Sequence, residues 1–129
     1  MSSIFSKIIS GEIPSHKIYE DQLTFAFLDI NPVQEGHVLV VPKVEVDNLF
    51  DLDEQNYQAV MNTVKKVAQR IQTVIKPRRV GIHVEGFDIP HAHVHVIPIN
   101  NGFKDFTPPL PSEPDHKALA TVASKLAFK

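Results

Sequence analysis

The segment "HAHVHVIP" at residues 91–98 carries histidine at three alternate positions. Successive side chains of an extended chain point to opposite faces, so His91, His93 and His95 should share one face while the apolar residues between them enter a core. Two kinds of chemistry use such a cluster. The imidazoles can bind a metal ion, with His83 of the preceding segment as a further ligand. Alternatively, one neutral imidazole can attack phosphorus while its neighbours donate hydrogen bonds to phosphate oxygens.

The histidine segment is expected to be one strand of a small sheet. Its valine and isoleucine residues favour a strand over 91–99, and Pro98 places the end of that strand at an edge or beyond the ladder. Earlier β-rich runs separated by turn residues predict four other strands, at 17–20, 24–30, 37–43 and 79–86.

One long helix is predicted over residues 52–75, where apolar residues recur at three- and four-residue spacing without Gly or Pro. At about 1.5 Å per residue, such a helix can lie across a whole small sheet. Asp51 and Glu54 form a capping-box pattern at its start. Short helices are expected near both ends of the chain, the first of them capped by Ser2 or Ser3.

Length and composition narrow the possible classes of protein. The 129 residues suit a single α+β domain over 1–129, with about five mostly antiparallel strands and one long helix packed across them. Thirteen basic and fifteen acidic residues give a net charge of -2, which argues against a nucleic-acid partner. The absence of cysteine excludes thiolate metal sites. No apolar run approaches a membrane span or a secretory leader, so we expect no membrane partner and a cytoplasmic location.

Longer stretches of the chain resemble a known family. The sequence "IFSKIISGEIPSHKIYEDQLTFAFLDINPVQEGHVLVVPK", followed by "NLFDLDEQ" and "PHAHVHVIP", closely resembles the histidine triad family of nucleotide hydrolases and transferases. The match runs from Ser3 to Ile99 in the order and spacing of the family. The resemblance implies a HIT-like fold and a hydrolase near the purine nucleoside phosphoramidase branch. Its expected substrates are AMP or GMP derivatives, either phosphoramidates or dinucleoside polyphosphates, and it implies a homodimer that needs no cofactor or metal.

The resemblance also implies a role for each polar residue of the site. It makes His93 the nucleophile toward the α-phosphorus, with its other ring nitrogen held by a backbone carbonyl. The flanking His91 and His95 bind phosphate oxygens or orient the middle ring, and His37 matches a fourth histidine of such sites. Asp29 matches the carboxylate that accepts hydrogen bonds from the ribose hydroxyls.

An apolar slot for the purine base is implied as well. Five residues match the family's positions for it, namely Phe5, Ile8, Ile13, Phe27 and Ile30.

The sequence departs from the family at several positions. Ser3 and Ser6 stand where some relatives carry a Cys-x-x-Cys zinc pair, and Glu45 stands where relatives commonly carry a histidine. We therefore expect that structural zinc site to be absent. Val84 replaces a frequent asparagine, and the loop "FDIP" at 87–90 is short. These departures leave the leaving group of the reaction open.

Two other functions stay open on the sequence. One is a metal-dependent hydrolase with His91, His93, His95 or His83 as ligands. The other is a nucleotide-binding sensor or scaffold that keeps the pocket without catalysis.

Overall fold

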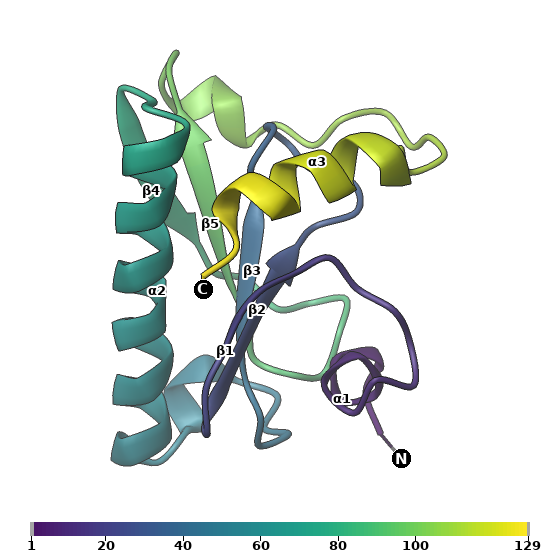
Figure 1. Cartoon of the computed structure of the whole chain (residues 1–129). Helices are drawn as coiled ribbons and strands as arrows, with labels where there is room; N and C mark the ends of the chain where they lie inside the picture. Colours follow the sequence, from purple (N-terminus) through teal and green to yellow (C-terminus); the bar gives the residue numbers. More distant parts are fainter. Residues whose placement is uncertain (1, 129) are drawn as a thin grey trace.

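The computed structural model describes residues 2–128, and its centre is one five-stranded sheet (Figure 1). All neighbouring strands are antiparallel, in the order β1-β2-β3-β5-β4. The strands are β1 (Lys17–Glu20), β2 (Thr24–Leu28), β3 (Val38–Pro42), β4 (Arg79–His83) and β5 (Val94–Ile99). The helices are α1 (Ile4–Ile9), α2 (Glu54–Val74) and α3 (His116–Leu126), with 3-10 turns at Leu49–Asp51 and Phe103–Phe106. This architecture confirms the predicted α+β fold.

Side chains alternate between the two sides of each strand, and this gives the sheet two different faces. One face packs against α2 and α3 and forms an apolar core that includes Val40, Val94 and Val96. The other face lies toward α1, where Phe5 packs among apolar side chains of β2 and β3. His95 pairs with Leu39 of that second face, so the histidine lies opposite the helix-covered core. The predicted division into an apolar face and a histidine face is confirmed.

The histidine strand begins later than predicted. β5 starts at Val94, so residues 91–93 precede it in an irregular conformation. The reason is a change of partner, because the backbone N–H of Ala92 donates to Val46 O at 2.7 Å, beyond the end of β3. Pro98 lies past the last residue of β5 that pairs with β3, but it does not lie beyond the ladder as predicted, because it still stands opposite Val80 of β4.

The long helix is slightly shorter than the predicted 52–75, and its capping residue differs. α2 begins after Asp53, whose carboxylate accepts a hydrogen bond from the Asn56 N–H at 2.8 Å. The predicted pair of Asp51 and Glu54 does not cap it, because residue 51 belongs to the 3-10 turn before the helix. α1 starts after Ser3, as predicted, with the serine hydroxyl as its cap. Among the helices of residues 2–128, none is both long enough and apolar enough to span a membrane.

Candidate functional site

His93 lies at the centre of the histidine cluster and is almost fully buried. Its Nδ1 is 2.8 Å from the backbone carbonyl oxygen of His91. A carbonyl can only accept, so Nδ1 carries the proton and the lone pair is on Nε2. The ring also meets Phe5 edge-on, with the two ring centroids 5.0 Å apart. An imidazole held in this form can act as a nucleophile through Nε2.

His91 is completely buried, and both of its ring nitrogens have partners. Nε2 is 2.8 Å from Pro42 O and must donate to it. Nδ1 therefore accepts, and the Ser3 hydroxyl donates to it at 2.7 Å. Burial lowers the pKa of His91, which keeps the ring neutral. No nitrogen of His91 is left to touch a substrate.

His95 is the exposed end of a chain of hydrogen bonds. The Val33 N–H donates to Nδ1 of His37 at 3.2 Å, so His37 carries its proton on Nε2. That Nε2–H donates to Nδ1 of His95 at 2.9 Å, which leaves the proton of His95 on Nε2. Burial, helped by neighbouring imidazoles, lowers the pKa of His95 to about 3. The ring is thus a neutral N–H donor.

The free Nε2 atoms of His93 and His95 open toward solvent. In residues 2–128, every fully buried side-chain nitrogen or oxygen has a hydrogen-bond partner. Neither Nε2 atom has one among these residues, so neither is fully buried. The two ring centroids are 5.1 Å apart. The Nε2 atom of His93 and the Nε2–H donor of His95 therefore lie on neighbouring rings, an arrangement suited to a phosphate group.

Asp29 follows β2 and reaches the same region. One carboxylate oxygen accepts from the Asn31 N–H at 2.8 Å, which makes Asp29 a turn former as well. The other oxygen is 3.7 Å from Nε2 of His37. Burial lowers the pKa of His37 although the charge of Asp29 acts in the opposite direction. The second oxygen of Asp29 has room for further donors.

The five apolar residues of the expected base slot divide into two groups. Phe5 and Phe27 are buried in edge-to-face contact, with their ring centroids 5.6 Å apart, and Ile8 packs against their cluster. Ile13 is half-buried and lies outside that cluster. Ile30 is 45% exposed, and it lines a hollow of about 170 Å³ between the β2–β3 loop and α3. Three of the five residues, Phe5, Ile8 and Phe27, therefore pack together.

Three of the site residues could hold a metal ion by distance alone. Asp29, His37 and His95 each offer a ligand atom, and these atoms lie within 4.8 Å of one another. The hydrogen bond from Val33 works against this use, because it assigns the proton of His37 to the same Nε2 that would face the ion. His83 also joins this face, with its ring centroid 5.7 Å from that of His95.

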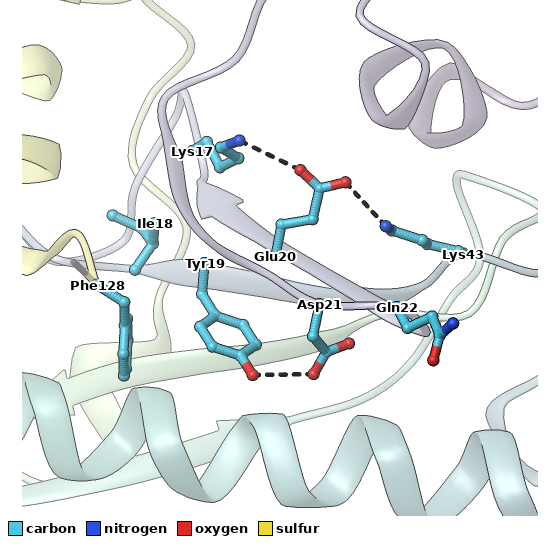
Figure 2. A pocket seen from close by; sticks show the side chains of 8 residues that line it. All are labelled: Lys17, Ile18, Tyr19, Glu20, Asp21, Gln22, Lys43 and Phe128. Carbon is cyan, nitrogen blue, oxygen red and sulfur yellow. Dashed lines mark hydrogen bonds and ion pairs between the residues drawn. The ribbon is translucent and has the colours of Figure 1, made fainter.

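A larger hollow, of about 580 Å³, lies elsewhere along β1 (Figure 2). Its charged side chains pair with one another, since Glu20 bridges Lys17 at 3.2 Å and Lys43 at 2.8 Å. Tyr19 donates to Asp21 at 2.9 Å. No histidine lines this hollow. We therefore assign the candidate site to the histidine face, although neither hollow is lined by His93 or His95.

Comparison with known proteins gives the family. Residues 10–102 match the family model described as the HIT domain. The chain belongs to the HIT family. An uncharacterised HIT-like protein of Borreliella burgdorferi is 39% identical over 109 residues, which cover 78% of this chain and 78% of that protein.

Two further relatives carry more descriptive names. An adenosine 5'-monophosphoramidase of Schizosaccharomyces pombe is 35% identical over 106 residues, covering 78% of this HIT chain and 77% of the relative. The crystal structure of a HIT-like protein involved in cell-cycle regulation from Bartonella henselae matches with a TM-score of 0.86 at 30% identity. That match covers 97% of this chain and 93% of the other.

Sequence reasoning missed several partners of the histidine rings. Ser3 stood out as a helix cap and as a departure from a zinc pattern, and Glu45 only as such a departure, yet Ser3 bonds directly to His91 and Glu45 bonds to Ser3. The pairing of a serine at the first helix cap with a distant histidine has no local signature. The Val33 N–H is a backbone group and carries no signature at all.

Proposed function

We propose that this HIT protein is a nucleotide hydrolase in which His93 attacks the α-phosphorus. The observation that carries the proposal is the 2.8 Å contact between Nδ1 of His93 and the carbonyl of His91. It keeps the lone pair on Nε2, where an incoming phosphorus can meet it. The name of the Schizosaccharomyces pombe relative supports a nucleoside phosphoramidate as substrate. Dinucleoside polyphosphates present the same α-phosphorus and belong to the proposal.

The reaction has two steps. Nε2 of His93 bonds to phosphorus while the bond to the amine or nucleotide breaks, and a departing amine takes up a proton from solvent. Water then bonds to phosphorus as the bond to Nε2 breaks, which releases the nucleoside monophosphate, returns a proton to solvent and restores the free imidazole. Division into two displacements lets one set of donors serve both transition states.

Two neighbours supply binding and charge stabilisation in this proposal. The Nε2–H of His95 donates to a phosphate oxygen as negative charge grows on it. Asp29 accepts from the ribose hydroxyls through the oxygen that its own turn leaves free. The cluster of Phe5, Phe27 and Ile8 provides an apolar wall for a purine.

The test is a turnover panel of adenosine and guanosine phosphoramidates beside dinucleoside polyphosphates, with and without exhaustive chelation. We expect release of the nucleoside monophosphate at equal rates with and without chelator. We also expect a nucleotidyl adduct on the protein when the reaction is quenched during turnover. Loss of activity on chelation would favour the metal-dependent hydrolase. Tight binding of nucleotide without turnover would favour a sensor or scaffold.

We also infer a homodimer, formed through the β4 side of the sheet. β4 is an edge strand, and an uncovered edge offers unpaired backbone groups to a second chain. Apolar side chains stand exposed beside it, with Ile82 at 48% and Val84 at 38%. Sedimentation at micromolar concentration should show a dimer, and Ile82→Lys should shift it toward the monomer. A monomeric wild-type protein would contradict this inference.

A further inference from the structure

Four polar side chains from three segments meet at the start of α1. Glu45 Oε1 accepts from the backbone N–H of Ser3 at 2.7 Å and from the Ser6 hydroxyl at 2.6 Å. The Ser3 hydroxyl accepts from the Ser6 N–H at 3.0 Å and donates to Nδ1 of His91 at 2.7 Å. A continuous line of hydrogen bonds therefore runs from an exposed carboxylate to a fully buried imidazole.

The start of the histidine run depends on such bonds because no strand ladder holds it. The backbone N–H groups of His91 and Ala92 donate to Ile89 O at 2.8 Å and to Val46 O at 2.7 Å. The side chain of His91 adds the two bonds of its ring and an edge-on contact with Phe5, and Ala92 is buried in the core. The carbonyl of this same residue sets the tautomer of His93. A contact that holds His91 in place therefore also holds the carbonyl that orients the His93 ring.

The chemistry of the bonds makes Ser3 hard to replace. Because the Nε2–H of His91 donates to Pro42 O, its Nδ1 needs a donor, and the serine hydroxyl is that donor. Glu45 helps to hold the start of the histidine run as well. Its side chain holds the start of α1, and the next residue, Val46, holds Ala92 through its carbonyl.

We propose that Ser3 and Glu45 are positioning residues for His93 and act on it through His91. Neither touches the reacting atoms. The proposal rests on the proposed function of His93. Its test must therefore distinguish a failure of the positioning role from a failure of that function. A pair of substitutions at Ser3 allows this, because glycine is nearly as good a helix cap as serine but has no hydroxyl, whereas threonine keeps the hydroxyl.

The experiment compares Ser3→Gly, Ser3→Thr and Glu45→Ala in the full chain. Ser10→Ala is the matched control, since that hydroxyl donates to Lys7 O and accepts from the Glu12 N–H at the other end of α1, away from the histidines. Ser3→Gly should lower kcat for adenosine 5'-phosphoramidate by about tenfold with KM unchanged, because the ring of His93 loses its fixed direction. Ser3→Thr and Ser10→Ala should match the wild type. Glu45→Ala should lower kcat by less, since the Ser3 hydroxyl stays in place.

A second readout needs no substrate. Nitrogen-15 NMR of the imidazoles should show a single tautomer for His93 in the wild type and in Ser3→Thr, and mixed tautomers for His93 in Ser3→Gly. Pro42 O should keep His91 in one tautomer in all three proteins. If the wild type turns over no nucleotide, the function proposed for His93 fails, yet the spectra still test the positioning. An unchanged tautomer of His93 in Ser3→Gly overturns the proposal, even if the protein is less stable. A changed tautomer with an unchanged kcat overturns it too, and a Glu45→Ala variant equal to wild type removes Glu45 from it.

Discussion

His91 and His95 stand two residues to either side of His93, yet their surroundings differ. His91 is fully buried and uses both nitrogens, toward the Ser3 hydroxyl and Pro42 O. His95 is partly exposed, uses one nitrogen toward His37 and leaves Nε2 open. A ring with no free donor cannot bind a phosphate oxygen, so only His95 can do so. We therefore propose that equal spacing in sequence gives one positioning histidine, His91, and one phosphate-binding histidine, His95.

The largest expected effect falls on the residue between them. His93→Ala should abolish turnover, a loss on the order of 10⁴-fold or more, because it removes the nucleophile on which the two-step route depends. The nucleotidyl adduct should disappear with it. Mass spectrometry of protein quenched during turnover of a labelled phosphoramidate measures both. His116→Ala, which changes an exposed histidine outside the cluster, is the control. An adduct undiminished in His93→Ala, or located on another residue, would contradict the mechanism.

Matched alanine substitutions test the contrast between the two flanking histidines directly. His95→Ala should slow nucleotidyl transfer on the order of 10² to 10³-fold, because it removes a donor to the phosphate, while an adduct at His93 still forms. Its effect on stability should be the smaller of the two, since the side chain is partly exposed.

His91→Ala should show the opposite pattern, with a larger loss of stability than His95→Ala. It empties a buried site and strands Pro42 O, so the free energy of unfolding should fall by about 2 to 4 kcal/mol. Pre-steady-state transfer rates and urea denaturation of both variants measure the two losses, of rate and of stability. If both variants lose rate and stability in the same proportion, the two histidines are equivalent and the comparison is wrong.

Much of the fold could be predicted because it follows local patterns. The strand at 17–20 has the predicted bounds, and the long helix differs by two residues at its start and one at its end. Hydrophobic periodicity predicts which residues are buried, and it assigned Ala92, Val94 and Val96 to the core correctly. It does not predict where a ladder stops, which here depends on a bond from Ala92 to Val46 O.

The candidate site could be predicted in outline only. Alternation brought three histidines to one region, but their tautomers depend on partners far away in sequence, such as Pro42 for His91 and Val33 through His37 for His95. Ile30 was expected in the base slot and lies 45% exposed, because it belongs to the loop after β2 and not to the strand. The catalytic roles, the single-domain extent of 1–129 and the cytoplasmic location stay predictions.

A smaller effect is expected at the ribose. If Asp29 holds the two hydroxyls, removal of the 2'-hydroxyl should weaken nucleotide binding by about 1 to 3 kcal/mol, the cost of leaving a charged acceptor without its donor. Titration calorimetry with AMP and 2'-deoxy-AMP measures the difference. Asp29→Ala should erase the preference. Asp29→Asn keeps the acceptor for the Asn31 N–H and serves as the control for the turn. Equal affinity of the wild type for both nucleotides would refute this role.

The smallest effect concerns stability against pH, and it tests whether His95 is held neutral. The folded pKa of His95 is about 3, whereas a histidine in the unfolded chain titrates near pH ~6.5. Above that region neither state is protonated, so His95 adds no pH dependence. As pH falls below it, the unfolded chain binds a proton that folded His95 does not, and the folded state loses stability until the pH nears 3. Burial lowers the pKa of His91 and His37 as well, which acts in the same direction.

At pH 5, His95 should therefore reduce the free energy of unfolding by about 1 to 2 kcal/mol relative to pH 7, after allowance for its partial exposure. Urea denaturation at pH 5, 6 and 7 measures this slope in a range where most carboxylates stay ionised. His95→Gln should have a shallower slope than the wild type by up to roughly one proton, because glutamine does not titrate. His116→Gln, which changes an exposed histidine outside the cluster, is the control that shows how far the loss of any one imidazole changes the slope. If His95→Gln keeps the wild-type slope, then His95 is not held neutral by the fold, and it could not serve as the neutral donor that distinguishes it from His91.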